Sequence, residues 1–214
     1  EHLPKLIHGL RNQSIKLQEM ILVDSGSTDR TREIALDLGM RVINVSKEEF
    51  SFGRSLNRGI AEIQTDVVLI LSAHVYVRNS DFLEQILEQF SDPWVGYVYG
   101  RQIGSEKSAF SEKRLMMDWY PPHPKLQSPE FANNANSAVR KSVWSTFKFN
   151  EELPGLEDVD FAKRILSAGH ITRYVHEATV IHEHNENWSK VAKRYRREAK
   201  AYHSISQDKR LGFP

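Results

Sequence analysis

Short apolar runs alternate with amphipathic stretches along the first half of the chain. The apolar runs cover residues 19–24, 41–45 and 67–71, and the stretches between them carry apolar side chains at helical spacing. The third run is apolar at each position, which is typical of a strand covered on both faces. This alternation predicts an α/β fold in which helices flank a mostly parallel, Rossmann-like central sheet with right-handed crossovers.

The pattern has two irregularities. Between residues 104 and 133 the periodicity fades and prolines gather, so we expect a long loop on the substrate side. Residues 3–12 have the spacing of a helix, although such a sheet usually opens with a strand, so we expect that the first strand is absent from this sequence. We expect a helix that Thr28 or Asp29 caps and that Gly39 ends. Further helices are expected at residues 54–63, 81–90, 157–168 and 188–205. Further strands are expected at residues 95–99, 171–174 and 178–181.

The length of 214 residues fits one domain that buries a sizeable core. Within it we expect a nucleotide-binding half over about residues 1–100 and an acceptor-binding and catalytic half over 101–187. The remaining residues, 188–214, are expected to form a basic amphipathic helix at the end of this single domain.

Composition narrows the class of protein. The formal net charge is +1, from 29 basic and 28 acidic residues, and this balance argues against a nucleic-acid partner because such binders usually carry a clear basic excess. Cysteine is absent, which excludes disulfides and thiolate chemistry. The sequence has no apolar run of about 18 residues and no signal-peptide pattern at its start. The simplest expectation is a cytoplasmic enzyme.

Asp24 ends the first apolar run and is followed by the turn Ser25-Gly26-Ser27 and a helix start. A carboxylate at this place can accept hydrogen bonds from a nucleobase or ribose, and the amides of the turn favour a nearby anion. The alternative is that Asp24 only caps the turn.

Glu157 and Asp158 are adjacent acids at the start of a predicted helix. The helix dipole there would hold their pKa values low and keep a general base ionised. The alternative role is structural, because acids in the first helical turn also stabilise a helix.

Four segments together resemble glycosyltransferase family 2, a group of inverting enzymes with the GT-A fold. They occur in the order that the family has. The segments are Val23-Asp24-Ser25-Gly26-Ser27-Thr28-Asp29-Arg30-Thr31, Thr65-Asp66 with the strand 67–71, Phe149-Asn150-Glu151-Glu152-Leu153, and Leu156-Glu157-Asp158-Val159-Asp160-Phe161 with Arg164.

This resemblance implies an enzyme that moves a sugar from a UDP- or dTDP-sugar donor to an acceptor hydroxyl with inversion, in polysaccharide or glycolipid assembly. It implies that Asp158 is the general base and that Glu157 supports it or orients the acceptor. The donor would bind at Asp24, Ser25, Arg54, Asn57, Ser72 and His74, and the sugars would contact Asn134, Asn136 and Trp119. For Asn57 a second role is open, as a hydrogen-bonding residue that ties its helix to the sheet.

Ser72-Ala73-His74 departs from the family, which has Asp-x-Asp at this place to hold Mn²⁺ or Mg²⁺ against the donor diphosphate. Three hypotheses follow. His74 binds a metal together with His182 or His184, or cationic side chains neutralise the diphosphate without a metal, or His74 only forms a hydrogen bond at the sheet edge.

Residues 50–59 resemble a segment of the family's bacterial rhamnosyltransferases, but Phe52 and Leu56 replace its His and Arg. The basic residues of 190–200 predict either a solvated helix face or a contact with an anionic membrane, where lipid-linked acceptors lie. The second contact would place the protein at the inner face of the membrane.

Two other classes compete with an active transferase. One is a non-catalytic nucleotide-sugar or glycan-binding domain on the same fold, which the altered residues 72–74 favour and the acids at 157–158 disfavour. The other is a nicotinamide-binding or nucleotidyltransferase enzyme. The dinucleotide fingerprint Gly-x-Gly-x-x-Gly follows none of the predicted strands, which argues against that class.

Overall fold

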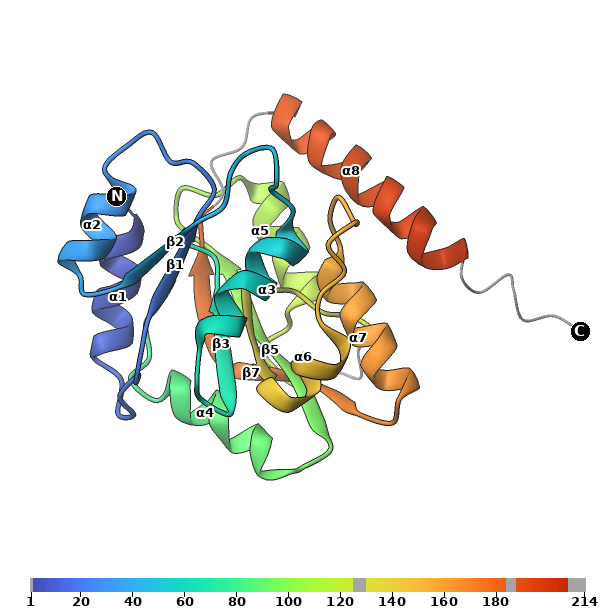
Figure 1. Cartoon of the computed structure of the whole chain (residues 1–214), viewed down its shortest axis with the longest axis horizontal. Helices are drawn as coiled ribbons and strands as arrows, with labels where there is room; N and C mark the ends of the chain where they lie inside the picture. The colour runs from blue at the N-terminus through green and yellow to red at the C-terminus, as the bar shows by residue number, and fades with distance from the viewer. Residues whose placement is uncertain (1, 125–129, 184–187, 208–214) are drawn as a thin grey trace, which may run out of the picture.

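A computed structural model describes residues 2–124, 130–183 and 188–207 (Figure 1). Helices flank two sheets, and a long helix, the last described element, runs along one side of the molecule. The helices are α1 (His2–Arg11), α2 (Thr31–Asp37), α3 (Phe52–Glu62), α4 (Phe82–Glu88), the 3-10 helix η1 (Gln89–Ser91), α5 (Phe110–Trp119), α6 (Lys141–Phe147), α7 (Glu157–Ser167) and α8 (Trp188–Gln207). The strands are β1 (Ile21–Asp24), β2 (Arg41–Asn44), β3 (Val67–Leu71), β4 (Val75–Val77), β5 (Val95–Gly104), β6 (Asn136–Arg140) and β7 (Ile171–His182).

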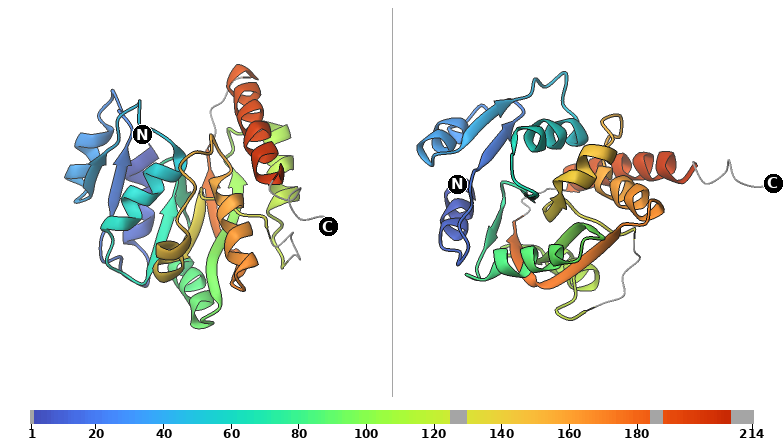
Figure 2. Two further views of the ribbon diagram at one scale, coloured as in Figure 1. Left: turned by 45° about the vertical axis from the view of Figure 1, so that its right-hand side comes forward. Right: turned by 60° about the horizontal axis from the view of Figure 1, so that its bottom comes forward.

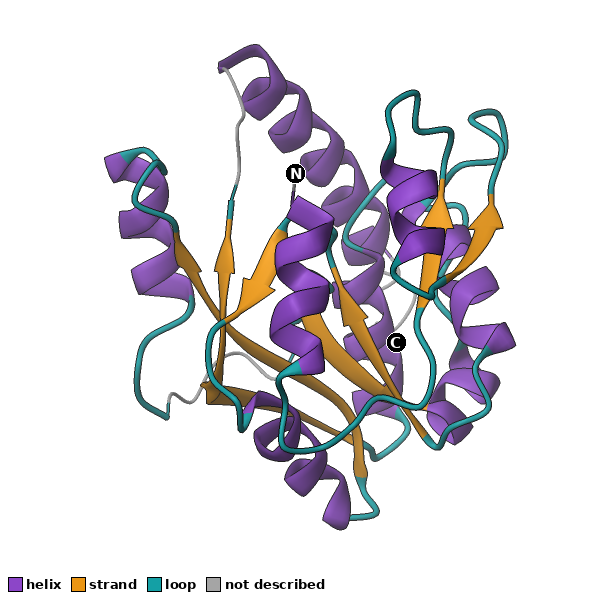
Figure 3. Ribbon diagram, turned by 90° about the vertical axis from the view of Figure 1, so that its left-hand side faces the viewer, coloured by secondary structure: helices purple, strands orange, loops and turns teal. Residues whose placement is uncertain are grey.

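The strands form a two-stranded sheet, β1-β2, and a five-stranded sheet in the order β3-β6-β5-β7-β4 (Figure 3). The pairs β1–β2 and β5–β7 are parallel, whereas β3–β6, β5–β6 and β4–β7 are antiparallel. The prediction of a mostly parallel sheet was therefore wrong, and the sheet is mixed. The apolar run of β3 indicates burial on both faces, but burial does not determine the direction of a neighbouring strand.

Alternating residues of the larger sheet enter two separate apolar clusters. Val68 and Ile70 pack in one cluster with Phe161 of α7, while their neighbours on β3 pack against the other cluster, which includes Ile7 of α1 and Phe82 of α4. Because successive side chains of a strand point to opposite faces, the sheet has a helical layer on each face. Figure 2 shows α8 on the opposite side of the molecule from α1 and α2.

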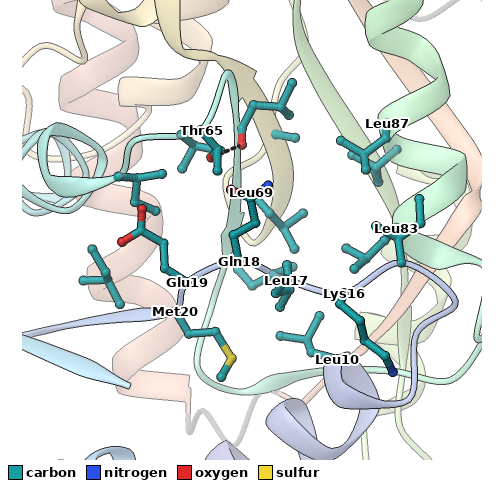
Figure 4. A pocket seen from close by; sticks show the side chains of 18 of the residues that line it. Leu10, Lys16, Leu17, Gln18, Glu19, Met20, Thr65, Leu69, Leu83 and Leu87 are labelled. Carbon is teal, nitrogen blue, oxygen red and sulfur yellow. Dashed lines mark hydrogen bonds between the residues drawn. The ribbon is translucent and has the colours of Figure 1, made fainter. Parts of the chain in front are cut away.

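β1 and β3 each form the edge of a sheet, and an apolar cavity of about 400 Å³ lies between them. Figure 4 shows Leu69 of β3, Leu83 and Leu87 of α4, Leu10 of α1 and Met20 around this cavity.

Several elements differ from the prediction, among them β6 and α6, which were not predicted. Residues 104–133 were expected to be a loop, but α5 lies within them, and its weak amphipathic pattern explains why it was not predicted. β7 is one continuous strand with an irregularity opposite Gly100 and Arg101, not two short strands. The three residues of β4 are too few to show a period in the sequence.

Candidate active site

A cavity of about 810 Å³ opens where β1 and β3 end and where α7 begins. Among its lining residues are six that the sequence predicted to belong to a functional site, from four distant parts of the chain. Those six are Ser72, His74, Asn134, Glu157, Asp158 and His182.

Glu157 and Asp158 form the first turn of α7, directly after Leu156, which has a left-handed backbone with φ 56°. Such a backbone is costly for leucine, and it turns the chain so that both acids enter the cavity wall. Glu157 is 6% and Asp158 is 9% exposed. The pair is thus buried at one wall of the site.

The two acids are held by hydrogen bonds from Asn134. Its backbone N–H donates to Asp158 Oδ2 at 3.0 Å and its Nδ2 donates to Glu157 Oε1 at 3.1 Å. The other oxygen of Asp158 accepts from the Val159 N–H at 2.9 Å. Burial raises the pKa of Asp158 to about 8, and the neighbouring charge of Glu157 adds to this effect. The expectation of low pKa values was wrong, because desolvation outweighs the helix dipole and also raises the pKa of Glu157.

Asn134 and Asn136 both form hydrogen bonds within the protein, and for Asn134, which lines the cavity, a contact with a sugar stays a prediction. The side-chain oxygen of Asn134 accepts from Tyr97 Oη and Ser137 Oγ, so both ends of this amide are bonded within the protein. Asn136 is fully buried, donates to the carbonyls of Arg101 and Ala178, and does not line the cavity. The prediction that Asn136 contacts a sugar was wrong, because an amide at the first position of β6 points into the sheet interior.

His74 and His182 face each other with ring centroids 4.7 Å apart. His182 Nδ1 lies 2.7 Å from Gln102 Oε1, and Gln102 Nε2 donates to Asn133 Oδ1 at 2.9 Å. Since Gln102 presents its oxygen, Nδ1 carries the proton and the lone pair of a neutral ring is on Nε2. Gln102 does not line the cavity but contacts His182, and it was not predicted because a glutamine within a strand gives no signal of its own.

The residues at the end of β3 fit a divalent metal poorly. Mn²⁺ and Mg²⁺ prefer carboxylate oxygens, and residues 72–74 supply a hydroxyl and an imidazole instead. In the described part of the chain no group of three or more His, Cys, Asp or Glu could hold a metal ion. His184, the alternative metal ligand, lies outside the described residues.

Asp24 ends β1, next to the cavity-lining Val23, and is 4% exposed. Its carboxylate accepts hydrogen bonds from the backbone N–H groups of Gly26 and Ser27, all at 3.2 Å. Asp24 therefore stabilises its own turn, which includes Ser25. A contact of these two residues with a nucleotide stays a prediction.

Asn57 ties α3 to the segment between α6 and α7. Its Nδ2 donates to Phe149 O and Glu151 Oε1, and its Oδ1 accepts from Trp144 Nε1 and the Phe149 N–H, at 2.9–3.0 Å. All four hydrogen-bonding positions of the amide are filled, so the prediction that Asn57 binds the donor was wrong and its structural alternative holds.

Arg54 and Trp119 do not line the cavity. Arg54 donates to Glu151 Oε2 at 2.9 Å and to the Glu49 carbonyl at 2.7 Å, so its guanidinium is engaged beside Asn57. Trp119 ends α5 and is 42% exposed. Contacts of these two side chains with a donor or a sugar stay predictions.

One face of α8 also lines the cavity, through Lys190, Arg194 and Arg197. We expected the basic residues of this helix to form a single surface feature. Their spacing of three to four residues, continued by the buried Ala201 and Ile205, indicates an inward stripe instead. None of the helices in the described ranges is long and apolar enough to cross a membrane.

The chain is similar in sequence to two curated rhamnosyltransferases. The chain is 27% identical over 195 residues to an O-antigen chain rhamnosyltransferase of Salmonella typhimurium, covering 85% of this chain and 62% of that protein. It is 30% identical over 190 residues to an O-antigen chain rhamnosyltransferase of Salmonella anatum, covering 83% of this chain and 60% of the relative. The chain thus spans about three fifths of the length of these curated relatives.

Solved structures share the fold. A mannosyltransferase of Pyrobaculum calidifontis, in complex with GDP-Man and Mn²⁺, aligns with TM-score 0.71 at 16% identity over 99% of this chain and 61% of that one. The glucosyl-3-phosphoglycerate synthase of Mycobacterium tuberculosis, with Mn²⁺ and UDP-glucose, aligns with TM-score 0.62 at 18% identity over 89% of this chain and 71% of that one. These likenesses show the GT-A fold. The family model "Glycosyl transferase family 2" matches residues 1–151, and the chain belongs to that family.

Proposed function

We propose that the chain transfers a sugar from a nucleoside diphosphate donor to an acceptor hydroxyl with inversion, and that Asp158 is the general base. The observation that carries this proposal is the position of Asp158, a buried acid with a raised pKa on the wall of the large cavity. A carboxylate whose pKa lies near neutral pH can both accept a proton and hold it through the transition state.

The proposed step is a single displacement. Asp158 accepts the proton of the acceptor hydroxyl, and the hydroxyl oxygen forms a bond to the anomeric carbon. The bond from that carbon to the diphosphate oxygen breaks on the opposite face, and the nucleoside diphosphate leaves with the electron pair. Asn134 and the helix start hold the acid during this step.

The donor is proposed to be a UDP- or dTDP-sugar that binds with its nucleotide toward Asp24 and Ser25 and its diphosphate toward Ser72 and His74. A deoxyhexosyl group is favoured, because both Salmonella relatives are named as rhamnosyltransferases. The acceptor is a glycan or a lipid-linked sugar, as the O-antigen in those names suggests, and the setting is the cytoplasmic side of polysaccharide or glycolipid assembly.

The outer face of α8 is proposed to contact an anionic membrane surface. Trp188, Tyr195 and Tyr202 follow one another at intervals of seven residues and are 84%, 44% and 63% exposed. Lys193 and Lys200 lie beside this row and are exposed. Aromatic side chains flanked by cations suit the interface of a bilayer with anionic lipids. Co-sedimentation should be stronger with phosphatidylglycerol vesicles than with phosphatidylcholine vesicles, and Trp188→Ala should reduce it.

A transfer assay tests the reaction. The purified protein is incubated with a panel of UDP- and dTDP-sugars and acceptor glycans, and the anomeric configuration of the product is read by NMR. Inverted product that is lost in Asp158→Asn supports the proposal. Donor binding without turnover under all conditions would favour the non-catalytic binding domain instead.

A further inference from the structure

α8 carries three cations on the face that lines the cavity. Lys190, Arg194 and Arg197 share this face with Ala201 and Ile205, which are 0% and 6% exposed and anchor the helix on the core. The anchoring is reinforced by Lys163 Nζ, which donates to the Ile205 carbonyl at 2.7 Å. Packing of Ala201 and Ile205 therefore holds this face of α8 at the cavity.

Arg197 has a buried hydrogen-bond donor, Nε, without a partner among the described residues. Its guanidinium stacks over the ring of Phe52 at 4.8 Å, and an added Cβ on Gly155 would lie 3.3 Å from Nε. Stacking fixes the plane of the guanidinium without using its donors. A buried donor without a partner is costly, so this place suits an anion.

The acidic groups near α8 do not cancel this charge. Glu157, whose pKa Arg197 pulls down against the effect of burial, is already bonded to Asn134. Glu198 lies 3.9 Å from Arg194 Nη1 and Glu183 lies 3.2 Å from His2 Nδ1, so each of these two carboxylates lies beside another basic side chain. Arg197 stays available for a further negative group.

The opposite wall lacks what a metal would need. Ser72 and His74 bring no carboxylate, and the two acids of α7 are hydrogen-bonded to Asn134 and Val159. The donor diphosphate would carry about two negative charges into this cavity, and an Arg guanidinium matches phosphate geometry with two parallel hydrogen bonds.

We infer that Arg197, with Lys190 and Arg194 beside it, binds the diphosphate of the donor and of the leaving group, and that transfer needs no divalent metal ion. This inference rests on the proposed function and adds to it the group that stabilises the departing charge. α8 is then part of the catalytic machinery on its inner face and separate from it on its outer face.

Binding of UDP and dTDP in the presence of EDTA tests the inference, with uridine and thymidine as matched probes without phosphate. Calorimetry should give the same diphosphate affinity in EDTA as in Mn²⁺. Arg197→Ala should weaken diphosphate binding roughly ten- to a hundredfold, the loss expected for a charged hydrogen-bonded pair, and leave nucleoside binding unchanged. Arg197→Lys should recover part of the loss.

Arg196→Ala is the matched control, because Arg196 is the neighbouring residue on the exposed side of the same helix. It should bind the diphosphates as the unchanged protein does. Equal loss of diphosphate and nucleoside binding in Arg197→Ala would mean a structural role and would overturn the inference. Diphosphate binding that requires Mn²⁺ and survives Arg197→Ala would also overturn it. Failure of both diphosphates to bind under either condition would instead contradict the proposed function.

Discussion

Asn134 bonds to both acids of the site at once, to Asp158 through its backbone N–H at 3.0 Å and to Glu157 through its side chain at 3.1 Å. The same side chain receives hydrogen bonds from Tyr97 and Ser137 on the strands of the larger sheet. The start of α7 is thereby fixed to β5 and β6 by one amide.

Asn134→Ala should weaken both the fold and the catalysis. Glu157 loses its side-chain donor and the buried Tyr97 hydroxyl loses an acceptor, so we expect the free energy of unfolding to fall by about 2–3 kcal/mol. The turnover number should fall by about tenfold or more, because the base is then less well placed. Urea unfolding and initial rates measure the two effects. Asn79→Ala, at an exposed position, should change stability by less than about 0.5 kcal/mol.

The rate of transfer should rise with pH until Asp158 is ionised. The base acts as a carboxylate, and its pKa of about 8 places the rise of kcat/KM on the alkaline side of neutrality. Glu157→Gln removes the charge that helps to raise this pKa, so the rise should move to lower pH. A profile of kcat/KM from pH 5.5 to about 9.5 checks both statements. A shift to higher pH in Glu157→Gln would contradict the assignment.

Asp158→Asn should be inactive but more stable, and the gain should grow with pH. The folded protein keeps the proton of Asp158 up to about pH 8, whereas the unfolded chain loses it near pH 3.9. Between these values the folded state binds more protons, so stability falls as pH rises through this window. Asparagine removes that loss, and we expect a gain of about 1–2 kcal/mol at pH 8 and less at pH 5. Urea unfolding at the two pH values measures this gain in the free energy of unfolding, and a gain that is larger at pH 5 than at pH 8 would contradict the prediction.

Asn57→Ala should lower the free energy of unfolding by about 2–4 kcal/mol, because it breaks four hydrogen bonds and leaves the buried Trp144 indole N–H without a partner. The affinity of the folded variant for UDP should stay near that of the unchanged protein. Glu62→Ala, which removes an exposed ion pair with Arg41, should cost less than about 1 kcal/mol. Weaker UDP binding with unchanged stability in Asn57→Ala would restore the donor-binding role.

The sequence predicted the positions of the helices and strands whose apolar periods are clear, as at residues 67–71 and 157–168, but not those of β4, α5, β6 and α6. Six of the polar residues that it selected line one cavity, namely Ser72, His74, Asn134, Glu157, Asp158 and His182, whereas Asp24 ends a strand of the other sheet. The sequence could not give the direction of β6 relative to β3, because both pairings bury the same residues. Nor could it give the pKa of Asp158, which depends on burial by segments far along the chain.

Side-chain partners were the least predictable part of the site. Asn57 and Asn136 have the chemistry of sugar-binding residues, and only their neighbours show that their amides serve the fold. Arg196 and Arg197 are neighbouring arginines that the sequence does not distinguish. The turn of α8 places Arg197 at the cavity and Arg196 on the surface. The helical spacing from Ala201 and Ile205 shows which basic residues face inward, but only after these two side chains are known to be buried.

The edges of β1 and β3 are separated by an apolar cavity, and among the described residues no backbone hydrogen bond joins the β1-β2 sheet, which carries Asp24, to the larger sheet, which supports Asp158. The smaller unit can then open without disrupting the larger one, and its amides should exchange hydrogen faster. A donor that reaches from Asp24 to α7 would bridge the two units. Ligand binding would in that case stabilise the folded state, and the two units would then unfold together rather than one before the other.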